Sequence, residues 1–226
     1  MEKLLIVAVY AVYAAFWLRF LGHTLVWWKA TQRFSEPVAP RVRAKACALT
    51  ATDVVFFNKL FWVNPGLWFG EWLFHATLTL VFLRHLRLVL DPVPACVWWV
   101  QTPGLIAGYL LPVSLGYILI IRLLTNQEKY VAPGNVFLLG LVLVISCVGL
   151  LMQALFKPDI VGVKLFILGF TGFSPAAVPD SFLFVLHFSL VLVLVPFLPT
   201  HIFTAPLVMM EARKREQALR LVIHEE

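Results

Sequence analysis

Long, uninterrupted apolar runs are the feature that most constrains this chain. A helix needs about 20 mostly apolar residues to cross the hydrocarbon core of a bilayer. The runs are continuous rather than alternating, which favours helices over the strands of a transmembrane barrel. We therefore expect an all-α integral membrane protein, a multi-pass bundle of five transmembrane helices at residues 4–28, 67–90, 103–124, 135–156 and 182–203.

The composition excludes most other classes of protein. Of the 226 residues, 61% are hydrophobic and only 13% are charged, so no sizeable soluble domain fits beside the spans. The net charge of +6 is interpreted as a topology signal, and we expect no nucleic-acid partner. Cys47, Cys96 and Cys147 show no C-x-x-C spacing, which predicts neither a disulfide framework nor an iron–sulfur site. The first apolar run has no small-residue cleavage site and is expected to be a retained span.

The distribution of Lys and Arg predicts the topology in the cell membrane. Twelve of these residues lie in connections that share one side, and five lie on the other. The positive-inside rule then places the N-terminus outside and the C-terminus in the cytoplasm. We expect a transmembrane domain at residues 1–206, with a cytoplasmic loop at 29–66, and a charged cytoplasmic tail at 207–226.

Two further segments are apolar but do not fit a span. The second half of residues 38–63 is apolar and aromatic, as in an interfacial helix or a docking surface for a cytoplasmic partner. Residues 161–173 are apolar but too short to cross, which predicts a helix at the outer interface.

Four of the six histidines lie inside predicted spans: His75 and His85 on the second, His187 and His201 on the fifth. An ionisable residue at membrane depth is costly and marks a candidate functional site. Imidazole can ligate haem iron while neutral. The sequence therefore predicts that these four side chains are haem ligands.

The order of the four histidines predicts how they pair. Spans two and five are antiparallel, so the late histidine of one faces the early histidine of the other, which gives the pairs His85/His187 near the outside and His75/His201 near the cytoplasm. The separations of ten and fourteen residues correspond to rises of about 15 Å and 21 Å. Tilt and kinks at Pro196 and Pro199 could absorb the difference.

A histidine inside a membrane can also bond to a neighbouring helix or line a polar cavity. Two on each of two antiparallel spans is a more specific pattern, and it favours haem. His23 and His224 are expected to be interfacial or solvated.

Polar residues near these histidines are secondary candidates. Arg84 and Arg87 flank His85 and could contact haem propionates or a quinone carbonyl, although snorkelling to headgroups is an equal alternative. Asp91 and Gln101 follow on the outer loop and are candidates for quinone proton exchange. Glu71, one turn before His75, is either a group that orients this histidine or an interfacial charge.

Several short motifs extend the pattern around these histidines: Trp72-Leu-Phe-His75, Phe82-Leu-Arg-His85-Leu-Arg87, Lys129-Tyr-Val-Ala-Pro133, Gly149-Leu-Leu-Met152, Val163-Lys-Leu-Phe-Ile-Leu-Gly169, Leu186-His187 and Leu198-Pro-Thr-His201. Over about residues 1–206 the chain with these motifs resembles the membrane cytochrome b subunit of the Dsr complex of sulfur-metabolising prokaryotes. That subunit is similar in turn to the gamma subunit of respiratory nitrate reductase and to the membrane subunit of heterodisulfide reductase.

The resemblance implies a five-helix dihaem cytochrome b with His75, His85, His187 and His201 as axial ligands of two b haems. It implies menaquinone as the electron carrier and a cytoplasmic iron–sulfur partner similar to the catalytic subunit of heterodisulfide reductase, with room for further membrane and outer-face redox subunits. Such a chain is a quinone-reactive, electron-transfer subunit of a respiratory oxidoreductase. The spacing of fourteen residues between His187 and His201 resembles the spacing in the Dsr and heterodisulfide reductase membrane subunits. The gamma subunit of nitrate reductase has a wider spacing between the histidines of its fifth span.

Two alternatives stay open at the level of the sequence. A haem-free polytopic transporter or assembly protein could use the histidines as a proton path, although no inverted repeat is evident between the halves of the chain. A membrane anchor could hold haem without a quinone site.

Overall fold

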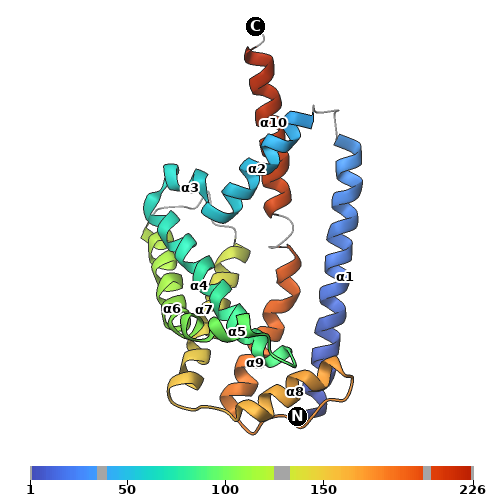
Figure 1. Cartoon of the computed structure of the whole chain (residues 1–226), viewed down its shortest axis with the longest axis vertical. Coiled ribbons are helices and arrows are strands. Elements are labelled where there is room, and N and C mark those ends of the chain that lie inside the picture. The colour runs from blue at the N-terminus through green and yellow to red at the C-terminus, as the bar shows by residue number, and fades with distance from the viewer. Residues whose placement is uncertain (1, 35–39, 125–132, 201–204, 225–226) are drawn as a thin grey trace. The chain divides into compact units, whose positions relative to one another are not determined.

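The computed structural model describes residues 2–34, 40–124, 133–200 and 205–224. Within these ranges all the regular secondary structure is helical (Figure 1), which confirms the predicted all-α class. The elements are α1 (Glu2–Phe34), α2 (Pro40–Phe56), α3 (Asn58–Val63), α4 (Pro65–Val89), α5 (Ala95–Trp99), α6 (Gln101–Leu124), α7 (Pro133–Ala154), α8 (Ile160–Thr171), α9 (Phe182–Leu194), the 3-10 turn η1 (Val195–Phe197) and α10 (Ala205–His224).

Four of the described helices are long and apolar enough to cross a membrane, within α1, α4, α6 and α7. They correspond to the first four predicted spans, so the chain is a multi-pass membrane protein. The predicted fifth span, 182–203, is a shorter apolar helix over Phe182–Phe197. The α-helix α9 changes at Val195–Phe197 to a 3-10 turn that contains Pro196, because proline cannot donate the backbone hydrogen bond of a continuing α-helix. The count of five spans and the orientation of the termini stay predictions.

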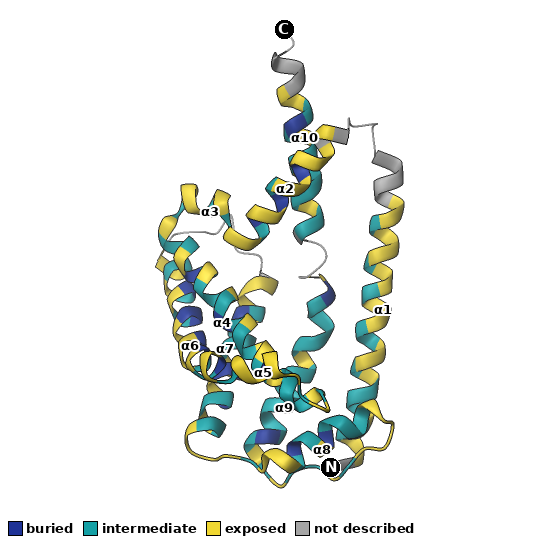
Figure 2. Cartoon of the chain, in the orientation of Figure 1, coloured by how far each residue is buried: buried dark blue, intermediate teal, exposed yellow. Residues whose placement is uncertain are grey.

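The described chain separates into two compact units. The first comprises residues 1–9 and 64–194, and the second comprises residues 10–63 and 195–226. In the first unit the most extensive packing is between α4 and α6, followed by α6 with α7 and α7 with α9. A core of Leu111, Leu115, Ile118 and Leu139 lies where α6 and α7 meet. Outside the core the residues of these helices are a mixture of exposed and partly buried ones in Figure 2, and many large apolar side chains among them are exposed, as expected for helices that face lipid tails.

Two glycines allow α4 and α6 to approach closely. A Cβ at Gly70 would lie 2.8 Å from Cδ1 of Tyr117. A Cβ at Gly104 would lie 2.7 Å from Cβ of Arg84 and 2.9 Å from the carbonyl oxygen of Leu80. Small residues at such crossings are typical of membrane helix pairs, whose stability comes from backbone-level packing. The α4–α6 pair is therefore the scaffold of the first unit.

Helix α8 occupies the segment that the sequence predicts as a short helix. The carboxylate of Asp159 caps its N-terminus by accepting hydrogen bonds from the backbone N–H of Val161 at 3.0 Å and of Gly162 at 3.1 Å, which satisfies donors that the helix leaves open. Val163 and Phe166 of α8 form a second apolar core with Phe184 of α9. Its place at the outer interface stays a prediction.

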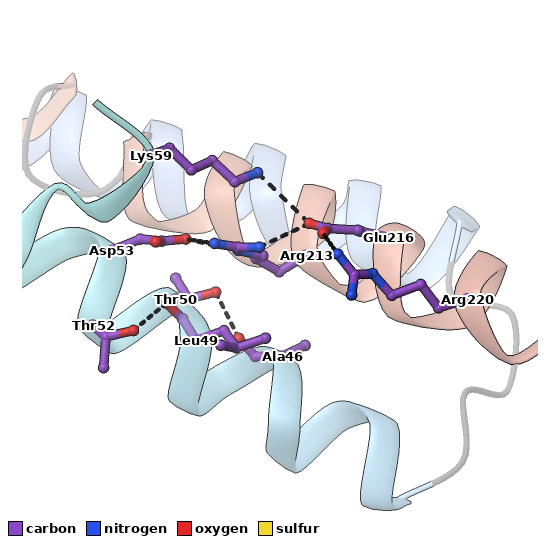
Figure 3. Close-up of polar contacts among 9 residues, drawn as sticks. All are labelled: Ala46, Leu49, Thr50, Thr52, Asp53, Lys59, Arg213, Glu216 and Arg220. Carbon is purple, nitrogen blue, oxygen red and sulfur yellow. Dashed lines mark hydrogen bonds and ion pairs between the residues drawn. The ribbon is translucent and has the colours of Figure 1, made fainter. Parts of the chain in front are cut away.

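In the second unit α2 pairs with α10 through a buried ion pair (Figure 3). Nε of Arg213 donates to Oδ2 of Asp53 at 2.7 Å, and Nη1 donates to Glu216 at 2.9 Å. Lys59 and Arg220 also contact Glu216, at 3.7 Å and 3.0 Å. The charged segment expected as a tail is thus a helix paired with α2, and its cytoplasmic location stays a prediction.

The electrostatics of this cluster favour its charged form. Burial opposes the charge of Arg213, but the hydrogen bonds and attraction to Asp53 and Glu216 outweigh burial and raise the pKa of Arg213. Burial alone would raise the pKa of Glu216, yet the contacts with Arg213, Lys59 and Arg220 lower it. The two helices are therefore held together by charges that persist at neutral pH.

Candidate functional site

His85 of α4 and His187 of α9 lie close enough for their side chains to interact electrostatically. Nδ1 of His85 lies 2.7 Å from the carbonyl oxygen of Val81, and Nδ1 of His187 lies 3.1 Å from that of Ile145. A carbonyl oxygen only accepts, so Nδ1 carries the proton in both rings. Nε2 then carries the lone pair, which is the form of imidazole that coordinates a metal.

Helix α7 positions the ring of His187. Ile145 supplies the acceptor for Nδ1, and Gly149, one turn later, lies directly against the ring. A Cβ on Gly149 would lie 3.2 Å from Cε1 and 3.6 Å from Nδ1 of His187. The sequence analysis gives Gly149 only as part of the motif Gly149-Leu-Leu-Met152, and the structure assigns its contact with His187.

His75, nearer the start of α4, has a separate environment. Its Nδ1 lies 2.7 Å from the backbone carbonyl oxygen of Glu71 and 4.0 Å from Oε2 of the Glu71 carboxylate. The same carboxylate accepts a hydrogen bond of 2.7 Å from Nη2 of Arg122 on α6. His75 therefore has the same Nδ1-protonated form as the other two histidines, with a carboxylate beside it.

The fourth predicted ligand, His201, lies outside the described residues, so the pair His75/His201 stays a prediction. The residue before it, Thr200, is described, and its hydroxyl lies 3.2 Å from Nε2 of His23. His23, expected at the interface, thus contacts the polar group that precedes His201 in the chain.

Arg84 and Gln101 belong to a polar cluster near His85. Nη2 of Arg84 donates to Oε1 of Gln153 on α7 at 3.4 Å. Nε2 of Gln101 donates to the carbonyl oxygens of Val97 at 3.0 Å and Arg84 at 3.4 Å. Oε1 of Gln101 is buried and has no hydrogen-bond partner within the described part of the chain. Sequence reasoning missed Gln153, whose only signal is an amide near the end of an apolar span.

The other two candidates differ in their surroundings. The charge of Arg87 acts on both Arg84 and His85, so Arg87 lies at the same end of α4. Asp91 instead forms an ion pair of 2.8 Å with Lys164 of α8, and its side chain is 66% exposed. The structure brings Arg84, Arg87 and Gln101 together near His85 and ties Asp91 to α8.

The donor set fits a haem iron with two axial imidazoles. The described residues contain no group of three or more His, Cys, Asp and Glu side chains able to hold a bare metal ion, whereas haem iron needs only axial protein ligands because the macrocycle supplies the rest. His85 and His187 come from different helices, and both have Nε2 in the coordinating form. These two residues can therefore hold haem. His75, nearer the other end of α4, has its Nδ1 bonded to a carbonyl oxygen in the same way.

Comparison with known proteins gives relatives of one kind. No family model matches the chain, and no solved structure matches it. A "Hdr-like menaquinol oxidoreductase cytochrome b-like subunit" of Archaeoglobus profundus is 30% identical over 170 residues, which cover 64% of this chain and 50% of the relative. A protein of the same description in Archaeoglobus fulgidus is 28% identical over 149 residues, which cover 59% of this chain and 45% of the relative.

These relatives confirm the resemblance that the motifs indicated. The chain spans about half the length of the curated relatives it matches, so the activity of a whole relative does not transfer with the match. What the comparison does establish is that this multi-pass membrane protein is similar to cytochrome b-like subunits of Hdr-like menaquinol oxidoreductases.

Proposed function

We propose that the chain is a dihaem b-type membrane cytochrome subunit of a respiratory redox complex. It transfers electrons between menaquinol or menaquinone and a cytoplasmic iron–sulfur subunit similar to the catalytic subunit of heterodisulfide reductase. The observation that carries the proposal is that His85 and His187 lie on separate helices within range of an electrostatic interaction, each with its Nδ1 bonded to a backbone carbonyl. The names of the two relatives, cytochrome b-like subunits of menaquinol oxidoreductases, support it.

In this proposal two pairs of histidines would hold the haems, His85 with His187 and His75 with His201. Haem, when bound, supplies a one-electron redox centre. The bonds from Nδ1 to Val81, Ile145 and Glu71 keep each ring in the coordinating tautomer and fix its orientation. Such bonds also make the ligand more basic. The protein thereby contributes ligation and rigid ligand geometry.

Quinone chemistry is proposed at the end of α4 that carries His85. Arg84 and Arg87 bring positive charge there, and Gln101 brings a buried carbonyl oxygen without a partner in the described chain. A quinol hydroxyl could donate to such an oxygen, and a guanidinium could polarise a quinone carbonyl. Asp91 is exposed and paired with Lys164, which makes it the candidate best placed to exchange protons with water.

A second class of function makes opposite predictions. A haem-free transporter or assembly protein would use the same histidines as proton carriers and would show no haem spectrum. The described histidines support the haem proposal, because Nδ1 of each lies within hydrogen-bond distance of a backbone carbonyl oxygen, which leaves the lone pair on Nε2 for a metal.

A pyridine haemochrome spectrum on the full chain purified in detergent tests the proposal. We expect two b haems per chain, and each of the variants His85→Ala, His187→Ala, His75→Ala and His201→Ala should lose one of them. His85→Ala and His187→Ala should lose the same haem, recognised by its midpoint potential. The control is His23→Ala, which removes a histidine that bonds to Thr200 and should keep both haems. A folded protein without haem would overturn the proposal.

A further inference from the structure

Glu71 lies between an arginine and one of the proposed haem ligands. Its Oε1 accepts from Nη2 of Arg122 at 2.7 Å, and its Oε2 lies 4.0 Å from Nδ1 of His75. The Glu71 side chain is only 12% exposed, so water screens its charge weakly. This carboxylate is thus placed to act on whatever His75 holds.

The packing of α4 on α6 keeps this arrangement rigid. Gly70 lies against α6, where a Cβ would meet Cδ1 of Tyr117 at 2.8 Å and Cγ1 of Ile118 at 2.9 Å. The hydroxyl of Tyr117 also donates to the carbonyl oxygen of Gly66 at 3.2 Å. Arg122 follows Ile118 by one helical turn, and the close contact at Gly70 therefore brings its guanidinium to Glu71. The counter-charge of the Glu71 carboxylate is therefore a fixed protein group, Arg122, and not a solvent ion.

We propose that Glu71, held by Arg122, is a positioning residue that orients His75 and lowers the midpoint potential of the iron that His75 ligates. The inference rests on the proposed function, since it requires His75 to hold haem. Oxidised haem iron carries one more positive charge than reduced iron. A fixed carboxylate near its ligand stabilises the oxidised form more than the reduced form. The backbone carbonyl of the same residue accepts from Nδ1 of His75 and orients the ring, while the carboxylate acts on it by charge from 4.0 Å.

The test is an optical redox titration of the purified holoprotein, which follows each haem without any quinol substrate. Glu71→Gln removes the charge and keeps an amide oxygen that can accept from Arg122. We expect two haems as in the wild type, with one of them easier to reduce, by on the order of tenfold in the ratio of reduced to oxidised haem, or about 59 mV. The haem that shifts should be the one that is lost in His75→Ala.

Glu71→Asp keeps the charge and should keep the potential close to that of the wild type, whereas a merely structural role would make the shortened side chain behave like the amide. The matched control is Asp180→Asn, which removes an exposed carboxylate from the loop before α9 and should leave both potentials unchanged. Two bound haems with unchanged potentials in Glu71→Gln would overturn this inference and leave the proposed function intact. Absence of haem in the wild type would instead overturn the proposed function.

Discussion

At the scale of the residue, the histidines owe their form to the backbone around them. His75 and His85 each bond through Nδ1 to the carbonyl oxygen four residues earlier in α4. This bond is local, because a histidine side chain on a helix can reach the carbonyl of the preceding turn. His187 differs, since its acceptor is Ile145 on α7, 42 residues away. Its orientation therefore depends on the packing of α9 on α7, and Gly149 makes that packing close enough.

A substitution at Gly149 tests this dependence. In Gly149→Val the new Cβ would lie 3.2 Å from Cε1 of His187 and its methyl groups would displace the ring from Ile145. We expect loss of one haem of two, the same haem that His187→Ala loses, measured by the pyridine haemochrome spectrum. Gly134→Val is the control, since a Cβ at Gly134 of the same helix meets nothing within 4 Å. Equal haem content in the two variants would contradict the assigned contact.

At the scale of the element, the α4–α6 pair is expected to tolerate side chains at some glycines and not at others. Gly104→Val places a Cβ within 2.9 Å of the Leu80 carbonyl oxygen and 2.7 Å of the Arg84 Cβ. Backbone cannot move aside cheaply, so we expect a loss of about 1–3 kcal/mol in stability. Gly108→Val, one turn further along α6 in open space, should cost less. Thermal unfolding of both variants in detergent measures the difference.

The α2–α10 pair makes a prediction about pH. Ion pairs lower the pKa of Glu216 in the folded chain. The stabilisation from its charge is therefore fully present above the pKa that Glu216 has in the unfolded chain, and it is lost as the pH falls through the pKa that Glu216 has in the folded chain. The pKa of Arg213 is raised, so Arg213 stays charged throughout. We expect α10 amides to exchange hydrogen faster, after correction for intrinsic rates, as the pH falls below the ordinary pKa range of a Glu carboxyl.

Glu216→Gln separates this effect from a general loss of structure at low pH. The amide has no charge to lose, so the exchange of α10 in this variant should already be fast at neutral pH and should change little as the pH falls. Hydrogen exchange followed by mass spectrometry reports both proteins peptide by peptide. A variant that keeps the pH dependence of the wild type would show that another group controls the pairing of α10 with α2.

At the scale of the whole molecule, the cysteines report topology. Cys47 lies on α2, Cys96 on α5 and Cys147 inside α7, and all three are exposed on the protein surface. If the N-terminus is outside, a membrane-impermeant maleimide should label Cys47 only from the cytoplasmic face and Cys96 only from the outer face. Cys147 should not be labelled from either face, because lipid covers α7. Labelling of single-cysteine variants in sealed vesicles of each orientation measures this, and the opposite pattern would invert the topology.

Much of the fold could be predicted from the sequence for a simple reason. In a bilayer the length and continuity of an apolar run decide whether a segment crosses, and both are local properties. These local properties predict the first four spans and the short helix α8. The irregular turn at Pro196 is also local, because it follows from the proline itself. The cost of an ionisable group in lipid likewise makes His75, His85 and His187 candidates on their positions in the sequence alone.

Only the tertiary structure decided which distant residues meet. The contact of His187 with Ile145 and Gly149, the bond from Arg84 to Gln153 and the ion pair of Glu71 with Arg122 each join different helices. Asp53 and Arg213 are 160 residues apart, and the local sequence around each of them does not predict the other as its partner. Lipid is as apolar as the helices themselves, so hydrophobicity puts each helix into the membrane but does not select its neighbour. That selection is made by close packing at glycines and by hydrogen bonds between helices, which depend on atomic shape and not on composition.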